Sequence, residues 1–243
     1  MSDLLLVTGA SSDIGMTLVR EWLAGNDGSV LAHANRGVAR LETLAAEFPS
    51  RVTPLVADLS DEVGTLALAD AVLEQGVPTS VVHLPAPRLQ YERFTKIKRV
   101  SFDADMAVQV HAAVALLGKL LPNMSKLPRA RVVFLLSSVV HGVPPKYMAQ
   151  YTVVKYAQLG LMRALAAEYA ATPVRINAVS PSMVETQFLS DISELAIQGA
   201  AEANPLGRNA KPVDITGAIR FLLSPEADYI SGVALPVTGG TAV

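Results

Sequence analysis

Short apolar runs alternate with longer stretches of helical spacing along the whole chain. Short runs of this kind are typical of strands that are buried on both faces of a parallel sheet. We predict strands at residues 4–7, 29–33, 52–57, 80–84, 131–137, 174–179 and 233–237. Apolar residues that recur every three or four positions predict helices at 14–25, 37–47, 62–75, 103–124, 150–170 and 213–223, with a shorter helix near 190–202.

This alternation predicts one α/β domain over residues 1–243, because no linker or break in composition divides the chain. Strands separated by helices form a doubly wound parallel sheet, here of about seven strands, with right-handed crossovers and helices on both faces. Ligands bind such sheets beyond the carboxyl ends of the strands. Five candidate segments fall at those ends: the turn at 8–15, Asp58, the stretch ending near Pro85, Ser138 and Pro181.

A glycine-containing turn, Thr8 to Gly15, separates the first strand from the first helix. Amide groups at the start of a helix point outward, and the helix dipole favours an anion there. A turn of this kind directly after a buried strand predicts a phosphate-binding site. Its candidate residues are Gly9, Ser11, Ser12, Asp13, Ile14 and Gly15.

Ser138, Tyr151 and Lys155 are the candidate catalytic residues. Tyr151 and Lys155 are four residues apart and share one face of a predicted helix. A lysine beside a phenol stabilises the phenolate and lowers its pKa, so that the phenol can exchange a proton with a carbinol oxygen. Ser138 follows a predicted strand that would bring it to the same pocket, and Ser137 is the competing serine.

Composition limits the function classes. The net charge of −2 gives no basic surface for nucleic acid. The chain has no cysteine, so it has neither disulfides nor thiolate metal ligands, and we predict no metal site and a cytoplasmic location. The apolar stretches are too short or too interrupted to predict a membrane span, and the N-terminus lacks the features of a signal peptide.

The chain resembles the short-chain dehydrogenase/reductase family from Leu4 to Gly240. The resemblance rests on the turn at 8–15 and on Tyr151-x-x-x-Lys155. It is strengthened by the segments 56–59, 177–186, 205–208 and 230–232 and by Gly239-Gly240. Within the family the layout is closest to the 3-oxoacyl-[acyl-carrier-protein] reductases. The resemblance implies a Rossmann-type fold and an NADPH-dependent ketoreductase acting on an acyl thioester bound to acyl carrier protein or CoA.

The resemblance also implies roles for individual residues. Tyr151 would protonate the developing alkoxide, Ser138 would hold the substrate oxygen, and Lys155 would lower the pKa of Tyr151 and bind the nicotinamide ribose. The cofactor-binding residues beyond the glycine turn would be Asn35, Arg36, Asp58, Leu59, Pro85, Tyr151, Lys155, Pro181, Val184 and Thr186. The substrate side would contain Val140, His141, Met148, Met183 and Phe188.

The second strand indicates which cofactor binds. An acidic residue at its end would bind the ribose hydroxyls of NAD, but this chain has Ala34, Asn35 and Arg36 there. A cation at this point suits the 2′-phosphate of NADP, so we expect NADP(H) rather than NAD(H). The alternative is that Arg36 is a solvated loop residue.

Three positions depart from the family pattern. Asp13 stands where glycine is usual; we expect it to turn outward and cap the helix at Ile14, the alternative being weaker cofactor binding. His83-Leu84-Pro85-Ala86 replaces an Asn-Asn-Ala-Gly stretch, and we expect His83 to be a core histidine rather than a proton carrier. Gln109, where many relatives have an asparagine that holds a water near the lysine, is a further candidate catalytic residue; it keeps the amide but adds a methylene, so that any proton relay must be re-routed.

Substrate and partners stay open at this point. The mostly apolar substrate side favours an acyl chain or another apolar ketone. The alternatives are an alcohol dehydrogenase or a nucleotide-binding partner subunit with weak catalysis. Lys126, Arg129 and Arg131 could meet an acidic carrier protein or form a solvated turn, and the basic segment 88–100 could be a surface helix or an interaction site. Apolar faces at 103–124 and 150–170 predict a homotetramer, with a dimer as the next choice.

Overall fold

The structure of the chain is a computed structural model that describes residues 3–89 and 91–241. Its strands are β1 (Leu4–Thr8), β2 (Ser29–Ala34), β3 (Val52–Val56), β4 (Ser80–His83), β5 (Ala130–Leu135), β6 (Val174–Pro181) and β7 (Ala234–Val237). Its α-helices are α1 (Asp13–Ala24), α2 (Val38–Glu47), α3 (Glu62–Gln75), α4 (Arg99–Met106), α5 (Ala112–Met124), α6 (Ala149–Glu168), α7 (Glu194–Ala203) and α8 (Pro212–Leu223).

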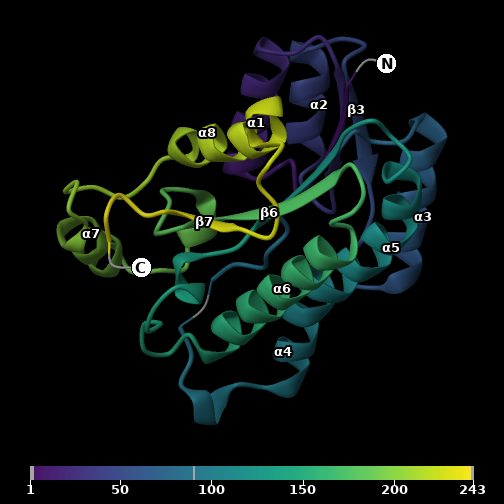
Figure 1. Cartoon of the computed structure of the whole chain (residues 1–243). Coiled ribbons are helices and arrows are strands. Elements are labelled where there is room, and N and C mark those ends of the chain that lie inside the picture. The colour runs from purple at the N-terminus through teal and green to yellow at the C-terminus, as the bar shows by residue number, and fades with distance from the viewer. Residues whose placement is uncertain (1–2, 90, 242–243) are drawn as a thin grey trace.

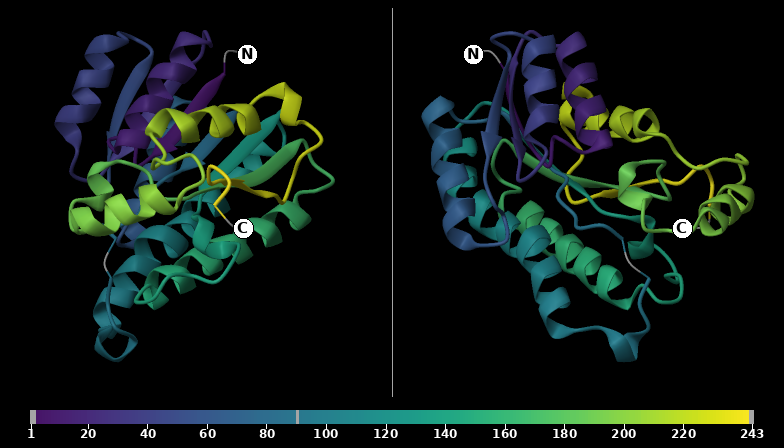
Figure 2. Two further views of the ribbon diagram at one scale, coloured as in Figure 1. Left: turned by 90° about the vertical axis from the view of Figure 1, so that its left-hand side faces the viewer. Right: turned by 180° about the vertical axis from the view of Figure 1, so that it is seen from behind.

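The seven strands form one parallel sheet in the order β3-β2-β1-β4-β5-β6-β7. Helices cover both faces, with α1, α2 and α8 on one side and α3, α5 and α6 on the other (Figures 1 and 2). The strand order reverses between β1 and β4, which is the switch point where doubly wound sheets bind ligands. The predicted fold class is therefore confirmed.

Each face of the sheet has its own hydrophobic core because side chains alternate along a strand. In β1, Leu5 and Val7 pack in the core under α1 and α8, whereas Leu6 packs in the core under α3 and α5. All three are completely buried. A strand buried on both faces must be apolar at every position, which explains the continuous run that predicted it.

Two predicted boundaries were wrong near the site. The strand predicted at 131–137 ends at Leu135, and Ser138 begins a 3₁₀ turn that ends at Val140. The helix predicted at 103–124 begins at Arg99 and contains a π-helical turn at Ala107–His111, between α4 and α5. Turns of this kind occur often at functional sites.

Among the described residues, the stretch Arg99–Met124 is the one helix with the length and composition of a membrane span. Its buried residues, among them Leu116, Leu117 and Leu120, instead belong to the core that also contains α3 and the sheet. Packing within the domain therefore explains why this helix is apolar.

Candidate active site

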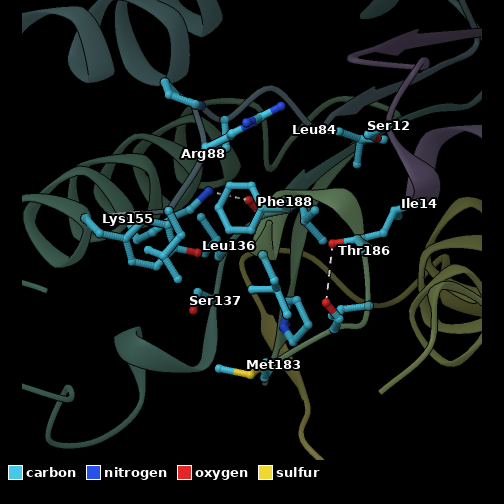
Figure 3. A pocket seen from close by; sticks show the side chains of 18 of the residues that line it. Ser12, Ile14, Leu84, Arg88, Leu136, Ser137, Lys155, Met183, Thr186 and Phe188 are labelled. Carbon is cyan, nitrogen blue, oxygen red and sulfur yellow. Dashed lines mark hydrogen bonds between the residues drawn. The ribbon is translucent and has the colours of Figure 1, made fainter. Parts of the chain in front are cut away.

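A cavity of about 1340 Å³ lies beyond the carboxyl ends of the strands. Ser12 and Ile14 lie on one side of it and Ser137 and Lys155 on the other (Figure 3). The structure brings nearly all of the sequence-predicted residues to its wall. These are Gly9, Ser11, Ser12, Asp13, Ile14, Asn35, Arg36, Asp58, Leu59, Pro85, Ser138, His141, Met148, Tyr151, Lys155, Pro181, Met183, Val184, Thr186 and Phe188.

The glycine turn has the geometry of a phosphate site. Gly9 has a φ of 74°, which favours glycine, and a Cβ there would lie 3.2 Å from the Pro85 nitrogen. Ser12 caps α1, since its hydroxyl accepts a hydrogen bond from the Gly15 amide at 3.1 Å. Gly15 does not line the cavity: a Cβ there would lie 2.6 Å from the Ala10 carbonyl oxygen, so glycine is needed for packing.

Asp13 neither caps α1 nor points away from the cavity, so the expectation for this residue was wrong. One carboxylate oxygen accepts a hydrogen bond from Arg40 at 2.7 Å, and the other accepts one from the Gln187 backbone amide at 2.7 Å. Burial raises the pKa of Asp13, but the bonds to Gln187 and Arg40 outweigh it and leave the pKa lowered. Asp13 thus joins the glycine turn to the segment after β6.

Two cations lie near the end of β2. Arg36 and Arg40 both line the cavity, together with Asn35 and Asp58. The pKa of Asp58 is lowered by hydrogen bonds, first from Ser60 and also from Asn35, and by the charge of Arg36. This end of the cavity therefore has two guanidinium groups and two carboxylates, and Arg40 forms an ion pair with Asp13. The Arg36 guanidinium suits the phosphate of a nucleotide. Sequence reasoning missed Arg40 because it lies within α2, beyond the end of the strand.

The Tyr151 phenol lies at the opposite end of the cavity, in the first turn of α6. The pKa of Tyr151 is raised to about 12, mainly by burial; a hydrogen bond with Ser137 opposes the shift, and Tyr91 adds to it. The net shift of this pKa is therefore upward, opposite to the lowering that we expected, because burial dominates it. Tyr151 is a protonated phenol at neutral pH, which is the form that donates a proton.

The serine beside Tyr151 is Ser137 rather than Ser138. The pKa of Tyr151 responds to the Ser137 hydroxyl, and that hydroxyl also accepts a hydrogen bond from the Val139 amide at 3.4 Å. Ser138 lines the same cavity from the next position and is less buried. Because β5 ends at Leu135, both serines lie after the strand, with Ser137 capping the 3₁₀ turn that begins at Ser138.

The Lys155 ammonium is buried and has two fixed acceptors. It donates to the Leu135 carbonyl at 3.0 Å and to Gln158 Oε1 at 3.0 Å (Figure 3 shows Lys155 at the cavity wall). It lies 5.6 Å from the centre of the Tyr151 ring. Burial lowers the pKa of Lys155 to about 7, and the charge of Asp105 opposes this shift.

Gln109 and Val140 were predicted as site residues but do not line the cavity. The Gln109 side chain is almost completely buried, and among the described residues its Oε1 has no hydrogen-bond partner. Its backbone carbonyl is the group that connects to the site, through Gln158 Nε2 at 2.9 Å. Val140 is buried in the core. Gln158 was missed because a glutamine within a helix gives no signal of its own.

His83 is a core histidine, as expected. Its Nδ1 lies 2.9 Å from the Thr8 hydroxyl, and its ring packs edge-on against Phe134. Burial lowers the pKa of His83 to about 3, with the charge of Lys155 acting in the same direction. An imidazole that stays neutral in this way supports the sheet rather than carrying protons.

The wall next to Tyr151 is largely apolar. Phe188 lies 6.5 Å from the Tyr151 ring, centre to centre, and Met183 and Met148 line the cavity nearby. Burial lowers the pKa of the His141 imidazole, so its neutral form is favoured. The sequence had not indicated that three α7 residues line the same cavity: Ala196, Ala200 and Ala203.

The two basic groups of the sequence lie in different places. Arg131 is buried and forms an ion pair with Asp228, and Arg129 lies 3.7 Å from Asp3, at the end of the sheet away from the cavity. The basic segment 88–100 instead borders the cavity, because Arg88 lines it. Arg93 stacks on the Tyr147 ring at 6.0 Å.

Comparison with known proteins agrees with the fold. A family model described as Enoyl-(Acyl carrier protein) reductase matches residues 9–242. The uncharacterized oxidoreductase YmfI of Bacillus subtilis is 30% identical, over 99% of this chain and 99% of that protein. The chain therefore belongs to the short-chain dehydrogenase/reductase family, a class of nicotinamide-dependent oxidoreductases.

Its relatives differ in their reactions. Galactitol 2-dehydrogenase of Cereibacter sphaeroides is 31% identical, over 98% of this chain and 94% of that protein. The crystal structure of a 3-ketoacyl-(acyl-carrier-protein) reductase from Brucella melitensis, complexed with NADH, superposes with a TM-score of 0.90 at 27% identity. That match covers 99% of this chain and 98% of the other. Family membership alone therefore leaves the substrate open.

Proposed function

We propose that the protein is an NADPH-dependent ketoreductase that reduces a 3-oxoacyl thioester, carried by acyl carrier protein or CoA, to the 3-hydroxyacyl product. The observation that carries this proposal is the protonated Tyr151 phenol facing a cavity whose neighbouring wall is apolar. A phenol that is protonated at neutral pH can give its proton to the alkoxide formed from a ketone, because that alkoxide is a stronger base than the phenolate. Apolar walls suit an acyl chain.

Each residue of the site has its own role in the proposed reaction. When bound, NADPH supplies the hydride. Tyr151 gives its proton to the developing alkoxide, while a serine hydroxyl from Ser137 or Ser138 holds the oxygen. Lys155 places a positive charge behind the phenol and so stabilises the phenolate that is left. Met183 and Phe188 exclude water from the reacting carbon.

The cofactor preference follows from the end of β2. The phosphate groups would bind at the glycine turn and the N-terminus of α1, where Ser12 already satisfies the Gly15 amide and leaves neighbouring amides for the ligand. Arg36 and Arg40 would bind the 2′-phosphate. We infer NADP(H) rather than NAD(H) on this basis, and no metal takes part in the proposed reaction.

We also propose a protein partner, an oligomeric state and a cellular location for the enzyme. The partner would be an acyl carrier protein, whose acidic surface suits the basic segment 88–100 at the cavity mouth. Exposed Val114 and Val153 lie on α5 and α6, the helices that we expect to pair in a homotetramer. We propose a cytoplasmic location, because NADPH and acyl carrier protein would both be supplied there.

The test is oxidation of NADPH, followed by its absorbance, with an acetoacetyl thioester as substrate and NADH in a parallel assay. Turnover with NADPH and at least about tenfold less with NADH would support the reaction and the role of the two arginines. Turnover only with a polyol and NAD would contradict both and favour a dehydrogenase. Cofactor binding without any turnover would favour a non-catalytic partner subunit.

A further inference from the structure

Gln158 is a buried polar residue at the inner side of the site. It lies on α6, three residues after Lys155, and its side chain is completely buried. Its Oε1 accepts a hydrogen bond from Lys155 Nζ at 3.0 Å, and its Nε2 donates to the Gln109 carbonyl at 2.9 Å. Both ends of the amide are therefore engaged. A buried amide with two such partners is fixed in one orientation.

The Gln109 carbonyl is an anchor outside α6. Gln109 lies in the π-helical turn that separates α4 from α5. Through Gln158, the Lys155 ammonium is thus connected to a second helix, in addition to its bond with the Leu135 carbonyl at the end of β5. Three elements converge on a single charged group, and Gln158 supplies the link between two of them.

The charged and titratable groups around Lys155 are few. Asp105 on α4 attracts the ammonium, His83 on β4 is close enough for its pKa to be lowered by it, and the Tyr151 ring lies 5.6 Å away on α6. Both direct acceptors of the ammonium are neutral carbonyl oxygens. A neutral amide oxygen orients a lysine without a full negative charge beside it, and so keeps its positive charge available to the phenol.

We propose that Gln158 is a positioning residue for catalysis: its amide fixes Lys155 against the π-helical turn, at the place from which the ammonium acts on Tyr151. This inference rests on the proposed ketoreductase function. It also replaces the expectation that the Gln109 side chain takes part in the proton relay. The backbone of Gln109 and the side chain of Gln158 occupy that place, and an amide bound at both ends holds the lysine.

Two substitutions at Gln158 act on Lys155 in opposite directions. Gln158→Glu keeps the size and places a carboxylate beside the ammonium, which raises the pKa of Lys155. Gln158→Leu removes the acceptor and leaves the ammonium less well satisfied, which lowers that pKa further. With NADPH and an acetoacetyl thioester, we expect the alkaline limb of kcat/KM to move up by about one pH unit in Gln158→Glu and down in Gln158→Leu. We also expect Gln158→Leu to lower kcat about 10- to 100-fold, with little change in the KM for NADPH.

The matched control is Asn177→Asp. Asn177 is another buried amide with both ends engaged, to the Ile230 carbonyl at 2.9 Å and the Val233 amide at 3.1 Å, and it does not line the cavity. This change carries the same cost of a buried acid, but it should leave the pH profile of the remaining activity in place. If the Gln158 variants kept the wild-type pH profile and kcat, or if Asn177→Asp moved the profile equally, the positioning role would be wrong.

A second readout needs no substrate. Because the pKa of Lys155 is lowered in the folded protein, the free energy of unfolding should rise between about pH 7 and 10.5, and Gln158→Glu should flatten this rise. Urea unfolding at several pH values measures it. A flattened rise in a protein that reduces no ketone would reject the proposed function while keeping the contact with Lys155. If the free energy of unfolding of Gln158→Glu rose with pH as in the wild type, the contact between Gln158 and Lys155 would be rejected.

Discussion

The carboxylate of Asp13 accepts a hydrogen bond from the backbone amide of Gln187 at 2.7 Å, although 174 residues separate the two in the chain. The same carboxylate binds Arg40, so its charge is balanced. The bond crosses the cavity from the glycine turn to the segment after β6, which contains Thr186 and Phe188. An aspartate at this position therefore connects two walls of the site.

Asp13→Asn is expected to speed the dissociation of NADPH about 3- to 10-fold, because it weakens one charge-assisted hydrogen bond and an ion pair with Arg40. Stopped-flow fluorescence of bound NADPH measures this rate. Asp70→Asn is the control. Asp70 lies on α3, far from the glycine turn, and forms an ion pair with Lys119 at the surface. Tighter NADPH binding in Asp13→Asn would instead indicate that the carboxylate repels the cofactor.

Tyr151→Phe is expected to lower kcat by at least about 1000-fold, because the proton donor is lost, while NADPH still binds. Tyr156→Phe makes the same chemical change on the same helix, at a side chain that is 45% exposed, and should keep full activity. Steady-state kinetics and a cofactor titration on both variants provide the test. Near-normal turnover in Tyr151→Phe would exclude the mechanism.

Alanine substitutions at Ser137 and Ser138 are expected to have different effects. Ser137→Ala should raise the pKa of Tyr151, because the hydrogen bond that opposes the effect of burial is lost. Ser138→Ala should lower kcat about 10- to 100-fold with little change in that pKa, if its hydroxyl holds the substrate oxygen. Ultraviolet titration of the phenol and the pH profile of kcat distinguish the two. A reversed pattern would assign the substrate contact to Ser137.

Lys155→Met is expected to yield an inactive but more stable protein. The unfolded chain holds the lysine proton up to about pH 10.5, whereas the folded protein releases it near pH 7. Between these values the unfolded state binds more protons, so wild-type stability rises with pH and is lowest below pH 7. The variant should lose this rise, and its free energy of unfolding below pH 7 should exceed that of the wild type by on the order of a few kcal/mol. Calorimetry from pH 6 to 10 measures it, and a parallel rise in both proteins would contradict the burial of the charge.

Charge reversal on the basic segment is expected to weaken binding of the carrier protein without changing the catalytic step. Arg93→Glu combined with Lys96→Glu should raise the KM for an acyl-[acyl-carrier-protein] about 10-fold or more, and change the KM for the same acyl group on CoA less than about 3-fold. Lys126→Glu, at the other end of the sheet, is the control. Equal effects on both substrates would mean that the segment shapes the cavity and does not dock a carrier.

Much of the site could be predicted from the sequence, because its residues follow strands whose positions the apolar runs fix. Gly9, Asp58, Ser138 and Pro181 reach the cavity for that reason. The helix spacing likewise placed Tyr151 and Lys155 on one face of α6. Parallel strands bring their carboxyl ends to one edge, so local pattern was enough to collect these residues.

The sequence by itself determined the seven strands, the doubly wound order and the edge where chemistry is possible, since burial on both faces demands continuous apolar runs. Only the tertiary structure decided what each polar group meets there. The Asp13–Gln187 bond, the engagement of Arg40 and the link from Lys155 through Gln158 to Gln109 join segments far apart in the chain. The pKa values of Tyr151 and Lys155 depend on burial in the folded domain, and spacing along a helix carries no information about burial.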